Sequence, residues 1–203
     1  MHIGIFGGSF DPVHFGHVRV AEACRDALPL ATVLFVPAAA QPLKPYGPIA
    51  SAEDRVRMLE LAIEGRPGLE VSPIEIDRAG VSYTVDTLRQ LSEQRPDDSL
   101  YLILGADALS DLPNWREPDE IRRLARLVVV DRPEARRIEP PRAAEAGKPS
   151  EVLRDVIHVP TEPLDVSSSE IRSRVARGES IAGLVPPAVA AYMERNQLYR
   201  GCA

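Results

Sequence analysis

Short apolar runs alternate with helix-like segments along most of this chain, and this alternation limits its fold more than any other feature. Six runs are predicted to be strands, at residues 3–6, 32–36, 70–76, 100–104, 127–131 and 156–159. Strands that are separated by helices usually run parallel, because each helix returns the chain to the same edge of the sheet. The pattern therefore predicts an α/β fold with a doubly wound, mainly parallel sheet.

The segments between these runs carry helix signals. The clearest helix spans 51–64, because Ser51 can cap its N-terminus, its apolar residues share one face and Gly65 can end it. Further helices are predicted at 18–27, at 85–91 with Thr84 as the cap, at 118–125 and at 186–199. These helices would link successive strands, and the last one would close the domain.

The composition is that of one globular domain. The chain has 203 residues, of which 44% are hydrophobic and 27% charged, so it can bury a sizeable core, and we expect a single domain over 1–203. Residues 132–151 differ, because they contain four prolines and a single large aliphatic residue. We expect a flexible surface insertion there, and its simplest interpretation is a solvated loop without a function.

Charge and cysteine content exclude several classes of protein. A formal net charge of −6 argues against a general nucleic-acid surface, which needs clustered Lys and Arg. Two cysteines, Cys24 and Cys202, make neither a disulfide framework nor a metal cluster, and we expect reduced thiols. Because no leader precedes the first strand and no apolar run reaches the ~18 residues that span a bilayer, we expect a cytoplasmic protein without a membrane partner.

The segment from Gly7 to His17 lies between the first predicted strand and a helical stretch. Paired glycines let the backbone turn there without Cβ clashes, so that backbone amides can face an anion. His14 and His17, three residues apart, can each donate a hydrogen bond to phosphate oxygens. Either histidine alone would more simply cap or pack a tight junction, but together with Asp11-Pro12 and the glycines they favour a nucleotide phosphate site.

These residues resemble a known family. His14-Phe15-Gly16-His17 resembles the HxGH signature of the nucleotidylyltransferase superfamily, and the preceding Gly-Gly-Ser-Phe-Asp-Pro is similar to that of bacterial nicotinate-nucleotide adenylyltransferases. The resemblance implies a Rossmann-like fold and transfer of AMP from ATP to nicotinate mononucleotide, which gives nicotinate adenine dinucleotide and pyrophosphate in NAD biosynthesis. Two alternatives stay open: another acceptor, such as nicotinamide mononucleotide or phosphopantetheine, and a non-catalytic nucleotide-binding regulatory module.

A second segment, Val166 to Arg172, predicts another anion site. Ser167 can cap a helix, Glu170 has the spacing of a capping box, and Arg172 lies about one turn further on. Alone, this is an ordinary capped helix, but it resembles the family's second signature, Ile-Ser-Ser-Thr-x-Ile-Arg. The resemblance implies that Arg172 holds the β- and γ-phosphates while His14 and His17 contact the α-phosphate and pyrophosphate. Mg²⁺ would arrive with ATP, and the chain would supply no metal ligands of its own.

The resemblance extends to the remaining site residues. The residues expected to bind ATP are Gly7, Gly8, Ser9, Phe10, His14, His17, Gly105, Asp107, Ser167, Ser168 and Arg172, of which His14, His17 and Arg172 are expected to be catalytic. Asp107 follows the glycine turn after a strand, where a carboxylate can bind ribose hydroxyls or cap a helix. The expected partners are ATP and nicotinate mononucleotide, with no nucleic acid, and a homo-oligomer is left open.

The residues expected to bind the pyridine nucleotide are Ser9, Lys44, Thr84, Trp115 and Arg116. Lys44 matches a family lysine, although Leu43 stands where the family has histidine, and a solvated loop lysine is its plain interpretation. Thr84, in Ser-Tyr-Thr-Val-Asp-Thr-Leu, would lie near the pyridine, or at a helix entrance, or both. Trp115 is expected to stack on the ring, whereas a lone Trp is more often part of a core. Arg116 stands where relatives commonly have Tyr.

Overall fold

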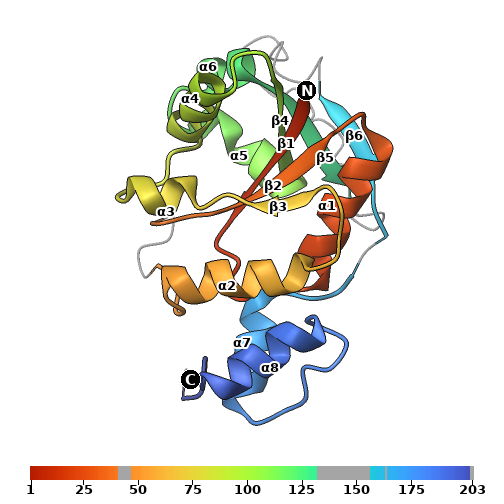
Figure 1. Ribbon diagram of the computed structural model, residues 1–203, viewed down its shortest axis with the longest axis vertical. Helices are drawn as coiled ribbons and strands as arrows, with labels where there is room; N and C mark the ends of the chain where they lie inside the picture. Colours follow the sequence, from red (N-terminus) through yellow and green to blue (C-terminus); the bar gives the residue numbers. More distant parts are fainter. Residues whose placement is uncertain (41–46, 132–155, 163, 202–203) are drawn as a thin grey trace, which may run out of the picture.

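The computed structural model describes residues 1–40, 47–131, 156–162 and 164–201 (Figure 1). Within these residues, the strands are β1 (His2–Gly8), β2 (Thr32–Pro37), β3 (Leu69–Val71), β4 (Ser99–Gly105), β5 (Ala125–Asp131) and β6 (Ile157–Pro160). They form one sheet in the order β3-β2-β1-β4-β5-β6, and every neighbouring pair is parallel. The predicted doubly wound parallel sheet is confirmed, with the strand order of dinucleotide-binding folds.

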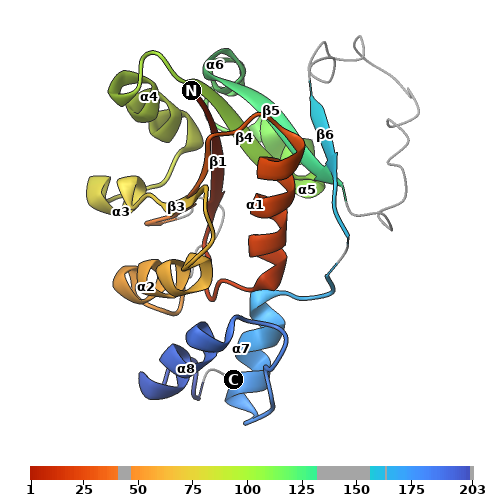
Figure 2. The same ribbon diagram turned by 45° about the vertical axis from the view of Figure 1, so that its right-hand side comes forward.

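Helices cover both faces of this sheet. They are α1 (Phe15–Ala27), α2 (Ala52–Ile63), α3 (Ile74–Arg78), α4 (Thr84–Gln94), α5 (Ala106–Asp111), η1 (Leu112–Asn114), α6 (Pro118–Leu124), α7 (Ser168–Ala176) and α8 (Pro187–Arg195). Figure 2 shows α1 and α4 on opposite sides of β1. One buried cluster joins the sheet to α1 and α2, and the other joins it to α3, α4 and α6.

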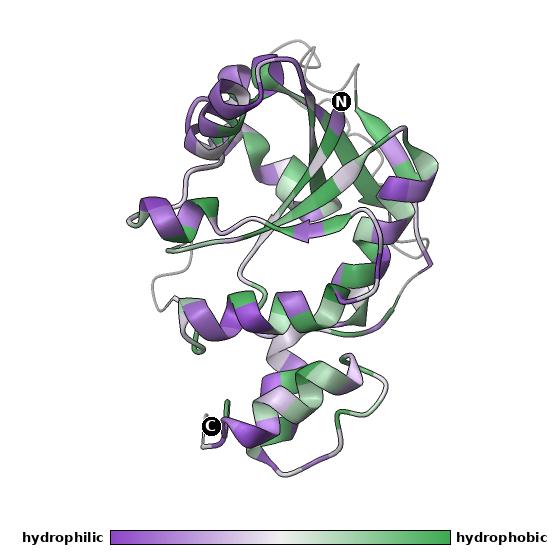
Figure 3. Ribbon diagram, in the orientation of Figure 1, coloured by the Kyte–Doolittle hydropathy of each residue, from purple (hydrophilic) through white to green (hydrophobic). Residues whose placement is uncertain are grey.

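Strand β4 shows why the central strands are mostly apolar on both faces. Tyr101 and Ile103 belong to the first cluster, whereas Leu100, Leu102 and Leu104 belong to the second. Successive side chains of a strand point to opposite faces, so a sheet covered on both faces needs apolar residues at every position. Figure 3 shows the resulting green strands between helices whose purple residues face outward.

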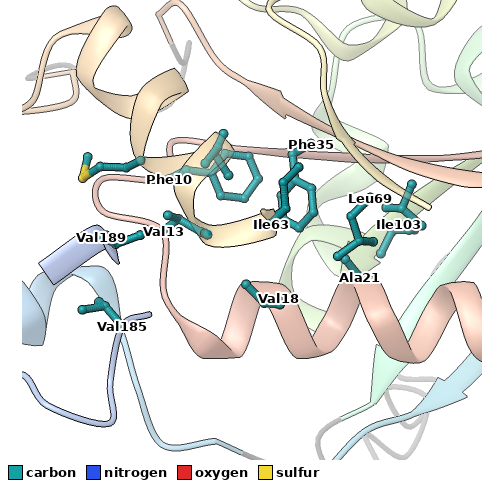
Figure 4. Packing of buried hydrophobic residues seen from close by; sticks show 14 of the residues in the cluster. Phe10, Val13, Val18, Ala21, Phe35, Ile63, Leu69, Ile103, Val185 and Val189 are labelled. Atoms are coloured by element: carbon teal, nitrogen blue, oxygen red, sulfur yellow. The ribbon is translucent and has the colours of Figure 1, made fainter. Parts of the chain in front are cut away.

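The C-terminal helices α7 and α8 lie beneath α2 (Figures 1 and 2). Val185 and Val189 belong to the same buried cluster as Val13, which follows β1, and Figure 4 draws all three. The end of the chain therefore packs against the segment between β1 and α1. In the described part of the chain, no helix combines the length and the apolar character that crossing a membrane requires.

Two predicted boundaries were wrong. The strand predicted at 70–76 stops at Val71, and Ile74–Arg78 forms the short helix α3. Pro73 lies between them, and because it has no backbone N–H it cannot continue the hydrogen-bonded ladder. Thr84 was predicted to cap a helix, but Tyr83 is the N-cap and Thr84 is the first helical residue of α4.

The helix at 51–64 was predicted well. The Ser51 hydroxyl accepts a hydrogen bond from the Asp54 backbone N–H at 3.0 Å, which confirms it as the N-cap of α2. The helix ends at Ile63, and Gly65 takes a left-handed conformation at φ +72° two residues later. The insertion predicted at 132–151 lies outside the described residues.

Candidate active site

The central strands β1 and β4 define where a ligand can bind. After β1 the chain moves outward through β2 and β3, and β4 then begins the other half of the sheet. Ile5 pairs with Leu102, a register that directs Gly8 and Gly105 to the same carboxyl edge. At such a switch point the connections leave in opposite directions and open a crevice.

The loop after β1 places both histidines at this crevice. His14 is buried and is the N-cap of α1, and His17 lies in its first turn. Their rings stack with centroids 3.7 Å apart. The backbone N–H of His14 donates to Nδ1 of His17 at 3.3 Å, so in the neutral His17 ring the proton resides on Nε2. His17 can therefore offer Nε2–H to a ligand.

The Phe10 side chain packs against the His17 ring. Its ring is 1% exposed, and its centroid lies 5.0 Å from that of His17 and 5.5 Å from that of Phe35. The apolar ring therefore lies in the core, and the expected contact of Phe10 with ATP stays a prediction. By its packing, the Phe10 ring restricts the position of the His17 ring.

The second motif docks directly on the first. Ser167 caps α7 by accepting a hydrogen bond from the Glu170 backbone N–H at 3.2 Å, as predicted. The Ser168 hydroxyl donates to the Pro12 carbonyl at 2.9 Å, and Arg172 Nη1 donates to the Asp11 carbonyl at 2.7 Å. Segments more than 150 residues apart are thereby joined by two hydrogen bonds.

A pocket of about 640 Å³, here called the histidine pocket, lies between these two motifs. Its lining includes His14, His17, Gly105, Ser167, Ser168 and Arg172, all of which were predicted to bind ATP. Arg19 and Glu162 add further charge to its wall. Hydroxyl, imidazole and guanidinium donors around one space are suited to a polyphosphate.

A second pocket of about 330 Å³, here called the tryptophan pocket, lies across the same edge of the sheet. Its lining includes five residues of the predicted site, which are Gly7, Gly8, Thr84, Trp115 and Arg116. Apolar residues from β1, β2 and β4 complete its walls. Such a lining suits a flat ring better than a polyphosphate.

The aromatic wall of the tryptophan pocket is held by polar contacts. Trp115 Nε1 donates to the Asp111 carboxylate at 3.2 Å, which fixes the indole. The Arg116 guanidinium lies over the Tyr83 ring, 4.8 Å from its centroid, and forms an ion pair of 3.6 Å with Asp86. Both residues therefore have defined positions at the pocket.

The structure does not bring all predicted residues to the two pockets. Ser9, Phe10 and Asp107 line neither of them. The Ser9 carbonyl accepts a hydrogen bond from Arg55 at 2.9 Å, and Asp107 lies in the first turn of α5, after its N-cap Gly105. Lys44 lies outside the described residues.

Three buried charged residues lie around the site; the sequence motif included Asp11 without a role for its carboxylate, and the other two were missed. Asp11 is 4% exposed and its carboxylate accepts the backbone N–H groups of Ile49 and Ala50 at 2.7 and 3.0 Å. Arg55 is 1% exposed; burial lowers its pKa, while the nearby Asp11 opposes that shift. An arginine on the otherwise apolar face of the helix at 51–64 was the available signal.

Glu75 is the third. It is buried in the wall of the tryptophan pocket, where its carboxylate accepts the Thr87 hydroxyl at 2.6 Å. Residues 70–76 were predicted to be a strand, so the direction of the Glu75 side chain could not be predicted. No group of three or more His, Cys, Asp or Glu side chains in the described ranges is arranged to hold a metal ion.

Comparisons with known proteins agree with this geometry. The model of the cytidylyltransferase-like family matches residues 5–174. In the solved structures, a nicotinic acid mononucleotide adenylyltransferase of Plasmodium falciparum, complexed with NaAD, superposes with a TM-score of 0.77 over 98% of this chain and 97% of that one, at 19% identity. Fold, site and family match define a nucleotidyltransferase of the cytidylyltransferase-like family.

Proteins of similar sequence show which kind of nucleotidyltransferase this is. A protein of Roseiflexus sp. (strain RS-1) is 50% identical over 98% of both chains, and one of Rhodopirellula baltica is 42% identical over 98% of this chain and 93% of its own. Both are named "Probable nicotinate-nucleotide adenylyltransferase". The chain therefore belongs to the nicotinate-nucleotide adenylyltransferase family, and the family expected from its sequence motifs is confirmed.

Proposed function

We propose that this enzyme transfers the adenylyl group of ATP to nicotinate mononucleotide, forming nicotinate adenine dinucleotide and pyrophosphate in NAD biosynthesis. The observation that carries the proposal is the pair of pockets at one switch point, one lined by phosphate donors and the other by Trp115. A transferase of this kind must hold two nucleotides with their phosphates together and their bases apart. The edge formed by Gly7 and Gly8 on β1 and Gly105 on β4 is where the phosphates would meet.

The reaction needs no protein nucleophile. A phosphate oxygen of the mononucleotide attacks the α-phosphorus of ATP, a new P–O bond forms, and the bond to the β-phosphate oxygen breaks to release pyrophosphate. Catalysis then consists of positioning and charge stabilisation. In this proposal His14 and His17 donate to the α-phosphate and to the departing pyrophosphate, and Arg172 binds the β- and γ-phosphates with help from Ser167 and Ser168.

The pyridine end would occupy the tryptophan pocket. Trp115 would stack on the ring, and Thr84 starts α4, whose N-terminal amides favour an anionic group such as the nicotinate carboxylate. Arg116 adds positive charge at the same pocket. The buried Glu75 carboxylate, which also lines this pocket, would repel the nicotinate carboxylate, which supports an orientation toward Arg116.

Three assignments rest on the family resemblance alone. These are the contacts of Ser9 and Lys44 with the pyridine nucleotide and the arrival of Mg²⁺ as the MgATP complex. The binding of ribose by Asp107 rests on the glycine turn that precedes this carboxylate in the sequence. We also propose the cytoplasm as the place of action, because both nucleotide substrates are available there.

Release of pyrophosphate tests the proposed function. The purified enzyme is incubated with MgATP and nicotinate mononucleotide, nicotinamide mononucleotide or phosphopantetheine in separate reactions. We expect the highest kcat/KM with nicotinate mononucleotide. Turnover with another acceptor alone would change the assigned substrate, and ATP binding without turnover on any acceptor would favour a regulatory module.

A further inference from the structure

Tyr199 lies near the end of the chain but reaches the first motif. Its side chain is 3% exposed, and its hydroxyl donates to Oδ1 of Asp11 at 2.7 Å. Burial and the neighbouring carboxylate raise the pKa of this hydroxyl, so it stays protonated and acts as the donor. Asp11 belongs to the loop that carries His14.

Asp11 is also the contact point of Arg172. Arg172 Nη1 lies 2.7 Å from the Asp11 carbonyl oxygen and 3.9 Å from Oδ2 of its carboxylate. The same arginine lines the histidine pocket. Tyr199 and Arg172 thus meet the same aspartate, one on the buried side and one on the pocket side.

The position of Tyr199 in the chain makes this contact unexpected. The match to the cytidylyltransferase-like family model ends at residue 174, so the tyrosine lies outside it. The residue takes a left-handed backbone conformation, at φ +63°, which is uncommon for a bulky side chain. The tail is thereby turned so that a distant segment supports the first motif.

We propose that Tyr199 is a positioning residue for the triphosphate half of the site, where its hydroxyl holds the Asp11 carboxylate and so keeps Arg172 directed at the histidine pocket. The inference deepens the proposed function, because it takes ATP as the ligand of that pocket. It adds a contribution from the end of the chain to a site otherwise built from the two motifs.

The physical basis is competition between the Asp11 carboxylate and the phosphates of ATP for the Arg172 guanidinium. Asp11 Oδ1 accepts the Tyr199 hydroxyl and the Ala50 backbone N–H. Without the hydroxyl, the carboxylate is less neutralised and attracts Arg172, 3.9 Å away, more strongly. An arginine drawn toward Asp11 is displaced from the β- and γ-phosphates, so ATP binding weakens while pyridine nucleotide binding does not.

The chain offers a matched control for this test. Tyr192, on α8, donates its hydroxyl to the Asp54 carboxylate at 2.8 Å, and neither residue lines the histidine pocket or the tryptophan pocket. Tyr199→Phe and Tyr192→Phe each remove one oxygen from a tyrosine–carboxylate pair in the same C-terminal segment. Only the first pair includes Asp11.

The experiment measures MgATP binding by isothermal titration calorimetry, together with the KM of each substrate and the melting temperature. We expect Tyr199→Phe to weaken ATP binding about tenfold, which is about 1.4 kcal/mol, and to leave the KM for nicotinate mononucleotide within about twofold. Tyr192→Phe should bind ATP as wild type does. Unchanged ATP binding in Tyr199→Phe, equal weakening in both variants, or equal loss for both substrates would overturn the proposal.

A double-mutant cycle tests whether Tyr199 acts through Arg172. In an Arg172→Lys background we expect Tyr199→Phe to change ATP binding less than about twofold, and a full tenfold effect there would refute the mediation. Calorimetry needs no acceptor, so the two proposals can fail separately. A wild type that binds ATP but does not turn over nicotinate mononucleotide would refute the proposed function and leave the Tyr199 result standing.

Discussion

Replacing His17 by alanine separates catalysis from folding. In the structure His17 accepts the His14 backbone N–H on Nδ1, which leaves Nε2–H as the atom that can donate to phosphate. Its ring also stacks on His14 and contacts the edge of Phe10. The variant therefore loses one local hydrogen bond and the ring contacts and, in the proposed mechanism, one transition-state donor.

The expected losses of turnover and of stability differ in size. One preorganised donor to developing phosphate charge is worth roughly 3 kcal/mol, so kcat should fall about 100-fold or more. The hydrogen bond to the His14 N–H resembles a helix-cap contact, and its loss should cost about 1 kcal/mol of unfolding free energy. For a chain of 203 residues that corresponds to a melting temperature lower by about 2–4 °C.

Steady-state pyrophosphate release and thermal unfolding of the same preparation measure both quantities. His17→Asn is the control, because its shorter amide keeps a donor in place of the imidazole and should retain more turnover than alanine. Near-normal kcat in His17→Ala would remove His17 from the mechanism. A fall in kcat that is matched by global unfolding at the assay temperature would show that the residue acts through the fold.

Three further predictions concern other parts of the molecule. Trp115→Ala should raise the KM for nicotinate mononucleotide at least about tenfold with a smaller effect on ATP, as measured by steady-state kinetics, because stacking contributes about 1–3 kcal/mol to binding an aromatic base; equal losses would indicate a structural tryptophan. Burial raises the pKa of the Cys24 thiol from 9.0 to about 12, so mass spectrometry should find it unalkylated in the native protein at pH 8 and alkylated in urea. Because the folded thiol is the weaker acid, its contribution to stability is complete below pH 9 and should decrease as pH rises toward 12, in urea titrations compared with Cys24→Ala. Ser51→Ala should lower the unfolding free energy by about 1 kcal/mol without changing kcat, since it removes the hydrogen bond to the Asp54 N–H outside the two pockets; an altered kcat would contradict this role.

The fold could be predicted because its main signals are local. Strands buried on both faces are apolar along their buried length, as β4 is from Leu100 to Leu104, and helices such as α2 carry their cap and stop residues in the sequence. The errors occurred where a local signal was ambiguous. The apolar run at 70–76 looks like one strand, but Pro73 divides it, and buried Ile74 packs as the start of a helix.

The sequence predicted many of the residues that line the two pockets, but it did not predict the buried contacts that hold them in place. Both histidines, Ser168 and Arg172 lie together at one pocket, as the motifs suggested. An apolar residue inside a glycine-rich motif, such as Phe10, can face either the ligand or the core, and sequence spacing does not distinguish them; its ring lies in the core, and its contact with ATP stays a prediction. Asp107 had the same ambiguity between helix terminus and ligand, and its binding role stays a prediction.

The sequence by itself determined the alternation of strands and helices, the two motifs and the family, because these depend on residues close together in the chain. Tertiary structure decided which distant groups meet. Asp11 receives backbone N–H groups from the segment before α2, the Tyr199 hydroxyl from the C-terminal end and Arg172 from α7. A buried carboxylate must find donors wherever the packed chain brings them. Those partners therefore follow from how the end of the chain packs against the first loop, and no spacing in the sequence specifies them.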